Sequence, residues 1–160
     1  MVHKIVFLDR DTIAPHIDIR RPSFKHEWTE YDRTKAEDVK ERLKDATIAI
    51  TNKAPIRKAT LEKCQNLKMI AIAATGSDIV DVEACNKRGI IVSNIRGYAV
   101  NTVPEHTFAL ILSLKRALVG YRQDVAGGEW LKAAQFCFFN HRIDDLRGSI
   151  LGIIGEGSLG

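Results

Sequence analysis

The last six residues of the sequence, 155–160, form a Gly-x-Gly-x-x-Gly motif behind the apolar run Ile150–Ile154. In such motifs the first glycine makes a tight turn, the second lets the backbone approach a pyrophosphate, and the third lets the next helix pack against the strand. The motif predicts the opening of a dinucleotide-binding unit; a flexible glycine-rich tail is the alternative. The residues expected to line the pyrophosphate are Gly155, Glu156, Gly157, Ser158, Leu159 and Gly160.

The histidines and cysteines form no pattern that indicates a catalytic pair or a metal site. Cys64, Cys85 and Cys137 lie far apart, without a C-x-x-C motif or a nearby histidine pair. This spacing argues against a zinc site or a disulfide framework and fits a reducing cytoplasm. We therefore expect no metal and a cytoplasmic location. The histidines without a carboxylate or cysteine partner at suggestive spacing are His3, His16, His26 and His141.

Composition and charge argue against several classes of partner. The 160 residues are 45% hydrophobic and 28% charged, as in ordinary globular proteins, and they suffice to bury a sizeable core. The formal net charge of +4 is spread along the chain without a basic block, so we expect no nucleic-acid partner. The N-terminal apolar stretch is too short for a signal peptide, and no apolar window reaches about 18 residues, so we expect no membrane partner.

Short apolar runs alternate with helical patterns over the first part of the sequence. This alternation indicates βαβ units, and therefore an α/β fold with a parallel sheet in the flavodoxin-like strand order. Thr60 is expected to cap one helix, and Gly89 to end another in the left-handed conformation. The expected strands are Lys4–Leu8, His26–Tyr31, Thr47–Thr51, Met69–Ala73 and Ile90–Ser93, and the expected helices are Lys35–Lys44, Thr60–Asn66 and Asp81–Arg88.

The pattern then changes to one long helix, Thr102–Tyr121, in which apolar residues recur at three- and four-residue spacing. Asn101 or Thr102 can cap this helix. Because the helix is apolar on more than one side, more than one packing partner is expected. Gly127-Gly128 interrupts the chain, and the aromatic segment Trp130–Phe139 that follows indicates an interface.

Five segments of the sequence, taken in order, carry a resemblance to a known family. They are Ile50–Ile56, Ala73–Val82 with Asn86–Asn94, Tyr98–Thr107, Gly128–Trp130 and Gly155–Gly160. Together they resemble the D-2-hydroxyacid dehydrogenases, and most of all the glycerate dehydrogenases, also called hydroxypyruvate reductases. The resemblance covers the whole chain. One departure is Pro104, which replaces the usual alanine in a Val-Ala-Glu helix start.

The resemblance implies a substrate-binding domain over residues 1–100, a connecting helix and dimerisation segment over 101–147, and the first strand and glycine loop of a truncated Rossmann domain over 148–160. It implies reversible hydride transfer between NAD or NADP, with NADH favoured, and a small 2-keto acid. Hydroxypyruvate, reduced to D-glycerate, is the favoured substrate, and glyoxylate, reduced to glycolate, is a second. A homodimer is also implied, and the long helix and the aromatic segment are expected to form it.

The resemblance also implies which residues bind the ligands. The turn Thr75-Gly76-Ser77 is expected to present backbone N–H groups to the substrate carboxylate; the alternative is an ordinary turn in which Ser77 or Asp78 caps the next helix. Lys53 is expected at the same edge of the sheet, either binding an acidic substrate or exposed to solvent. Thr102 corresponds to a cofactor-contacting hydroxyl, and its alternative role is plain helix capping.

In the family, the catalytic arginine, histidine and glutamate come from the part of the chain that follows residue 160. We therefore expect no catalytic residue within this chain, a structural role for His106, and no activity from residues 1–160 alone. One alternative is a non-enzymatic, dinucleotide-sensing scaffold of the same fold, which would lack those three residues. Another is a different family member, such as a phosphoglycerate or formate dehydrogenase; a phosphorylated substrate calls for more cationic groups than Lys53 near the turn.

Overall fold

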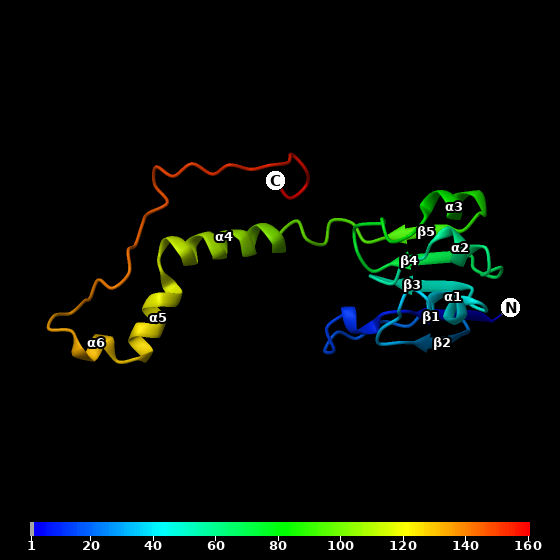
Figure 1. Ribbon diagram of the computed structural model, residues 1–160, viewed down its shortest axis with the longest axis horizontal. Helices are drawn as coiled ribbons and strands as arrows, with labels where there is room; N and C mark the ends of the chain where they lie inside the picture. The colour runs from blue at the N-terminus through cyan, green and yellow to red at the C-terminus, as the bar shows by residue number, and fades with distance from the viewer. Residues whose placement is uncertain (1) are drawn as a thin grey trace. The chain divides into compact units, whose positions relative to one another are not determined.

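The computed structural model describes residues 2–160, and the chain divides into two compact units between Arg96 and Gly97 (Figure 1). The first unit holds all the strands, and the second holds three helices followed by a long segment without regular structure. Within the described residues, no helix combines the length and the apolar character that a bilayer crossing requires.

The first unit is built on one five-stranded sheet in which every pair of neighbouring strands is parallel. The strand order is β2-β1-β3-β4-β5, which confirms the predicted parallel α/β fold and its flavodoxin-like order (Figure 1). No strand boundary differs from the predicted one by more than one residue. The strands are β1 (His3–Phe7), β2 (His26–Glu30), β3 (Ile48–Thr51), β4 (Met69–Ile72) and β5 (Ile91–Asn94).

Three short helices, α1 (Val39–Leu43), α2 (Lys58–Leu61) and α3 (Val82–Lys87), share one hydrophobic core with the sheet. Each connects two parallel strands in the direction from β2 towards β5. Because such crossovers are right-handed, the three helices pack on the same face of the sheet. The buried residues that join helices to strands include Val6, Leu43, Ala49, Leu61, Ile70 and Cys85.

The connection from β1 to β2 runs in the opposite direction along the sheet, so the same handedness places it on the other face. It contains the 3₁₀ helix η1 (Arg10–Thr12) and an irregular loop. Two apolar side chains of this connection, Ile13 and Ile19, lie with Phe7 of β1 and with β3 and β4 around an apolar cavity of about 260 Å³. This face is therefore covered less completely than the face that carries the helices.

Two of the predicted helices of the first unit begin at other residues. Helix α1 is shorter than the predicted Lys35–Lys44, because residues 36–38 form a turn of partly or fully exposed side chains that offers the core nothing to bury. Helix α2 starts at Lys58 behind an extended Arg57, so the prediction that Thr60 is the N-cap is wrong. Gly89 does adopt the left-handed conformation, with φ of 68°, as predicted.

The second unit contains α4 (Thr102–Lys115), α5 (Leu118–Ala126) and α6 (Glu129–Lys132), so the predicted single helix Thr102–Tyr121 is wrong. The break lies at Ala117, whose φ of 47° and ψ of 38° are left-handed. The backbone N–H of Asp144 donates to the carbonyl oxygen of Lys115 at 2.8 Å, which satisfies a carbonyl that α4 itself leaves free. A long-range contact therefore ends α4, and apolar spacing alone does not reveal it.

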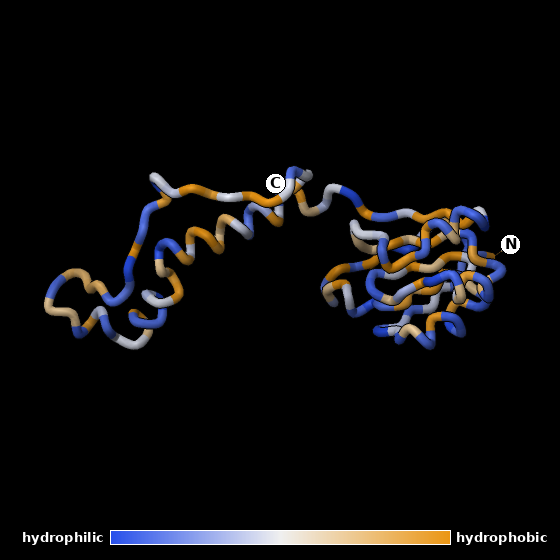
Figure 2. Tube along the Cα trace, turned by 45° about the horizontal axis from the view of Figure 1, so that its top comes forward, coloured by the Kyte–Doolittle hydropathy of each residue, from blue (hydrophilic) through white to orange (hydrophobic). Residues whose placement is uncertain are grey.

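Apolar side chains remain exposed along the whole second unit. Figure 2 shows hydrophobic residues distributed along its trace. None of residues 97–160, all of which the structure describes, is fully buried. Leu114 is 81% exposed, and Phe136 is 84% exposed. The strand predicted at Ile150–Ile154 is not formed, because no described segment pairs with it, and Ile150 is 98% exposed.

Candidate functional site

The carboxyl ends of β3, β4 and β5 bring three polar segments of the first unit to one edge of the sheet. In the register of the sheet, Thr51 pairs with Ile72, and Ile72 pairs with Asn94. The Lys53 loop directly follows β3, and the turn Thr75–Ser77 follows β4. Open parallel sheets bind ligands at this edge, where loops diverge and backbone amides are left unpaired. The predicted substrate-binding residues Lys53, Thr75, Gly76 and Ser77 therefore lie on neighbouring loops of the same edge.

The turn Thr75–Ser77 has the backbone chemistry of an anion-binding turn. Thr75 and Gly76 are exposed, and no described residue accepts a hydrogen bond from the backbone N–H groups of Thr75, Gly76 or Ser77. Successive free amides on a turn make a concave, electropositive surface that suits a carboxylate. Helix α3 takes its cap from Asp81, whose side chain accepts from the N–H of Ala84, so the alternative in which Ser77 or Asp78 caps this helix is wrong.

Asn94, the last residue of β5, fixes the orientation of this turn. Its side-chain amide donates a hydrogen bond to the carbonyl oxygen of Thr75 at 2.7 Å. The carbonyl oxygen of Thr75 is therefore engaged, while the N–H groups of the turn have no described acceptor. Asn94 is not among the site residues that the sequence predicted. Its position at the end of an apolar strand was the available signal, but a single asparagine there is also common at the start of a turn.

Lys53 is exposed, and the loop that carries it is attached to Asp9. The Asp9 carboxylate accepts hydrogen bonds from the backbone N–H groups of Asn52, Lys53 and Ala54, at 2.9, 2.5 and 2.8 Å. Asp9 is only 4% exposed. Asp9 is not among the predicted site residues either, although a carboxylate directly after the buried run at β1 was a visible signal. Its partners lie more than forty residues further along the chain.

An open cleft of about 420 Å³ lies beside Lys53. Its second cation, Arg33, forms an ion pair with Asp11, and the hydrogen bond that the guanidinium donates to that carboxylate raises the pKa of Arg33. Among the described residues, no carboxylate lies within ion-pair distance of the Lys53 ammonium group. Lys53 is therefore the cation of this cleft that is free to bind an acidic ligand. The lining residues are Asp9, Asp11, Thr12, Arg33, Thr34, Lys53 and Ala54.

The predicted cofactor-binding residues all belong to the second unit. Thr102 is the exposed first residue of α4, and Asn101 before it makes no side-chain capping bond. Gly155 has a φ of 111°, a conformation that favours glycine. However, a Cβ atom added at Gly155 or Gly157 would meet nothing within 4 Å, and neither a strand nor a helix flanks the motif. In the described residues the motif therefore lacks the strand and the helix that flank such a loop in a dinucleotide-binding unit.

Comparison with known families places this edge of the sheet in context. The family of D-isomer specific 2-hydroxyacid dehydrogenases, through its catalytic domain, matches residues 7–146. The chain belongs to this family. The matched range contains the Lys53 loop, the turn Thr75–Ser77, Asn94 and Asp9. The predicted family membership is therefore confirmed.

Two curated relatives are similar to this chain over almost its whole length. A putative 2-hydroxyacid dehydrogenase of Haemophilus influenzae is 50% identical over 157 residues, which are 98% of this chain and 50% of the relative. A glycerate dehydrogenase of Methylorubrum extorquens is 49% identical over 161 residues, which are 100% of this chain and 51% of the relative. The chain therefore spans about half the length of the curated relatives it matches.

A solved structure shows the same fold. The NADPH-dependent glyoxylate/hydroxypyruvate reductase of Sinorhizobium meliloti, in complex with NADP and malonate, is 25% identical and superposes with a TM-score of 0.75. The match covers 100% of this chain and 48% of the reductase. The family thus includes nicotinamide-dependent enzymes.

Proposed function

We propose that the protein containing this chain reduces a small 2-keto acid reversibly to the D-2-hydroxy acid, with NADH or NADPH as the hydride donor. Hydroxypyruvate, giving D-glycerate, is the favoured substrate, and glyoxylate, giving glycolate, is a second. One observation carries the proposal: the loops after two neighbouring strands present free backbone amides, at Thr75–Ser77, and a cation without an ion-pair partner, Lys53. The similarity to a glycerate dehydrogenase at 49% identity supports the choice of substrate.

In this proposal the residues described here bind and orient the substrate. The N–H groups of Gly76 and Ser77 donate to the substrate carboxylate, and Lys53 supplies the countercharge. Hydrogen bonds from two amides and a cation to one carboxylate are charge-assisted, and they fix the direction in which the keto carbon points. NADH is the favoured reductant, and Thr102 and residues 155–160 are its proposed contacts, with Gly155, Glu156, Gly157, Ser158, Leu159 and Gly160 along the pyrophosphate.

Reduction of a keto group also needs a proton donor that works near neutral pH, for which histidine is the usual residue. His3 and His26 begin β1 and β2, at the opposite edge of the sheet from Lys53. His141 belongs to the second unit, where its Nε2 lies 3.0 Å from the carboxylate of Asp124. As the family resemblance implies, we assign no catalytic residue to this chain and propose that residues 1–160 alone are inactive. We further propose a substrate-binding domain at 1–100, a connecting and dimerisation segment at 101–147, the first strand and glycine loop of an NAD(P)-binding domain at 148–160, and a cytoplasmic homodimer.

The test is an assay of the full-length protein with NADH and, separately, with NADPH. Cofactor absorbance is followed after the addition of hydroxypyruvate, glyoxylate, pyruvate or 3-phosphohydroxypyruvate. We expect turnover with hydroxypyruvate to be the most efficient and turnover with glyoxylate to be second. Efficient turnover of the phosphorylated acid instead would replace the proposed substrate, and no turnover with any 2-keto acid would contradict the proposed function. Purified residues 1–160, assayed in parallel, are expected to show no turnover.

A further inference from the structure

We propose that Asp9 is a positioning residue that holds the Lys53 side chain at the substrate-binding edge of the sheet. The inference rests on the proposed function, because it assigns Asp9 a part in substrate binding through Lys53. Asp9 lies at the end of β1 and does not itself need to touch the substrate. Its carboxylate binds the backbone of the Lys53 loop, and this loop presents the Lys53 side chain to the cleft.

Three consecutive backbone amides converge on the Asp9 carboxylate. Oδ2 accepts from the N–H groups of Asn52, Lys53 and Ala54 at 3.0, 2.5 and 2.8 Å, and Oδ1 accepts from Asn52 at 2.9 Å. Burial of a carboxylate is unfavourable unless such hydrogen bonds replace its hydration. On the inner side of the loop, the hydroxyl of Thr51 donates to the carbonyl oxygen of Ala54 at 2.7 Å. The loop conformation is therefore specified by Asp9 and the end of β3.

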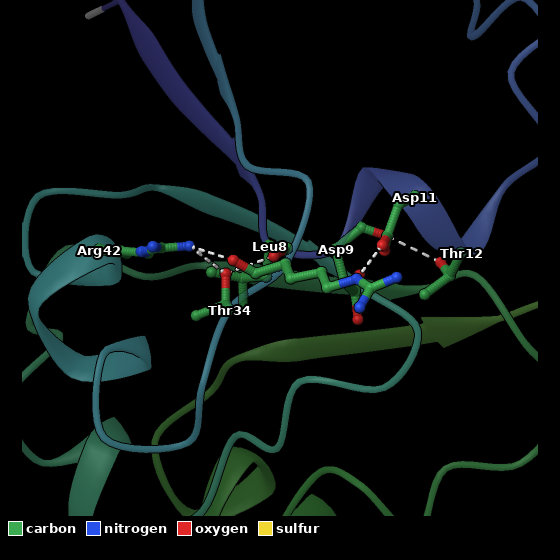
Figure 3. Close-up of polar contacts among 7 residues, drawn as sticks. Leu8, Asp9, Asp11, Thr12, Thr34 and Arg42 are labelled. Carbon is green, nitrogen blue, oxygen red and sulfur yellow. Dashed lines mark hydrogen bonds and ion pairs between the residues drawn. The ribbon is translucent and has the colours of Figure 1, made fainter.

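The backbone around Asp9 is itself held on both sides (Figure 3). The hydroxyl of Thr12 donates to the carbonyl oxygen of Asp9 at 2.8 Å, and the hydroxyl of Thr34 donates to the carbonyl oxygen of Leu8. The guanidinium of Arg42 in turn donates to the Thr34 hydroxyl at 2.7 Å. These contacts tie Asp9 to β1, to the segment after β2 and to α1, so the carboxylate is a rigid anchor.

This anchoring leaves Lys53 one way to act on a ligand. Its backbone N–H donates to the Asp9 carboxylate, so only its side chain is available to a ligand in the cleft. In the turn Thr75–Ser77, by contrast, the backbone amides are available to a ligand, because they have no described acceptor. One loop therefore presents a charge, and the neighbouring turn presents amides. A loss of loop geometry at Asp9 is expected to weaken ground-state and transition-state binding of the substrate carboxylate alike, which raises KM more than it lowers kcat.

The experiment is a double-mutant cycle in the full-length protein with Asp9→Asn, Lys53→Ala and the combination of both. Asp9→Asn keeps the side-chain volume but removes the negative charge. It also replaces one carboxylate oxygen with an NH2 group, which cannot accept hydrogen bonds from the three backbone N–H groups. We expect each single variant to raise KM for hydroxypyruvate roughly tenfold, with KM for NADH unchanged and kcat within about twofold. We expect the double variant to resemble Lys53→Ala alone. The matched control is Asp45→Asn, which removes an exposed carboxylate from the turn before β3, at the opposite edge of the sheet, and should leave KM unchanged.

Multiplicative effects of the two substitutions would overturn the proposal, as would an Asp9→Asn variant that lowers only the unfolding temperature. If Asp9→Asn does not fold, amide hydrogen exchange in the wild-type protein decides. The amides of Asn52, Lys53 and Ala54 should exchange at least about tenfold more slowly than those of Gly76 and Ser77. D-glycerate should then protect Gly76 and Ser77 without changing Lys53. Equal exchange in the two loops would refute the anchoring, whereas a wild-type enzyme inactive on every keto acid would refute the proposed function itself.

Discussion

The side-chain amide of Asn94 lies 2.7 Å from the carbonyl oxygen of Thr75 and joins the end of β5 to the turn that follows β4. A second bond in the same place runs from the N–H of Ile95 to the carbonyl oxygen of Ala74 at 3.1 Å. Two successive carbonyls of the turn are therefore bound by β5 and the residue after it. With its carbonyls engaged, the turn keeps its N–H groups available on the exposed side.

Asn94→Ala is expected to impair substrate binding without unfolding the protein. The contact is solvent-exposed, so its loss should change the free energy of unfolding by no more than about 0.5 kcal/mol. The freed turn should raise KM for hydroxypyruvate several-fold, and steady-state kinetics of the full-length protein measure this change. Asn66→Ala is the matched control, because Asn66 is an exposed asparagine in the loop before β4, at the opposite edge of the sheet. Equal KM values in the two variants would contradict this role of Asn94.

Asp81→Ala is expected to destabilise the first unit by about 1 kcal/mol, a typical loss for a helix cap. The Asp81 carboxylate accepts from the N–H of Ala84 at 2.9 Å at the start of α3. Asp38 occupies the corresponding position of α1 and makes no side-chain capping bond. Asp38→Ala should therefore cost less than about 0.5 kcal/mol. Urea unfolding midpoints of the two variants compare them directly, and similar losses would show that the Asp81 bond is not the cause.

Local pattern and chain handedness were enough to predict the sheet. Each apolar run of four or five residues is flanked by turn residues, and right-handed crossovers leave few strand orders. The helix ends were harder to predict, because capping depends on backbone geometry that composition does not specify. Thr60 has the right side chain for an N-cap, yet the preceding Arg57 takes that position. In contrast, Gly89 adopts the predicted left-handed conformation just after α3, whereas Asp81, which caps the start of α3, was not among the expected caps.

The candidate site was predictable only where function and local motif coincide. The turn at Gly76 follows a strand and contains glycine, but the family resemblance was needed to favour a binding turn over an ordinary one. Asp9 and Asn94 act on segments that are distant along the chain, and the spacing of residues carries no information about such contacts. The register of β1 against β3 brings Asp9 to the Lys53 loop. That register is set by the pairing of strands that lie more than forty residues apart in the sequence, so no local pattern predicts it.

Ala117→Gly is expected to leave the protein unchanged or stabilise it by up to about 1 kcal/mol. A left-handed conformation costs a residue with a Cβ atom roughly 1–2 kcal/mol, and the extra freedom of glycine in the unfolded chain offsets part of the gain. Ala109→Gly is the matched control, because Ala109 is exposed within α4 and should lose about 1 kcal/mol of helix stability. Urea unfolding followed by circular dichroism distinguishes the two. A loss at position 117 equal to that at 109 would contradict the helix break.

The buried thiols of Cys64 and Cys85 are expected to resist alkylation, while Cys137, which is partly exposed, reacts first. Burial raises the pKa of the Cys64 thiol above its ordinary value of 9.0. Burial also raises the pKa of Cys85, and the nearby Asp81 carboxylate adds to the effect. Mass spectrometry after brief labelling with iodoacetamide at neutral pH should therefore find the label on Cys137. Labelling of Cys64 at the same rate would show that the core of the first unit opens readily.

The same pKa directions make stability depend on alkaline pH. A thiol whose pKa is higher in the folded state than in the unfolded chain keeps its proton longer when folded. Its contribution is complete below about pH 8, and it is lost as the pH rises through 9 and beyond, by at most about 1.4 kcal/mol per pH unit and thiol. The free energy of unfolding should therefore fall between about pH 8 and pH 10. Cys64→Ala lowers stability at every pH by removing core volume, but it should flatten this alkaline slope, whereas Cys137→Ala should not. If wild type and Cys64→Ala showed parallel curves, the buried thiol would not be the titrating group.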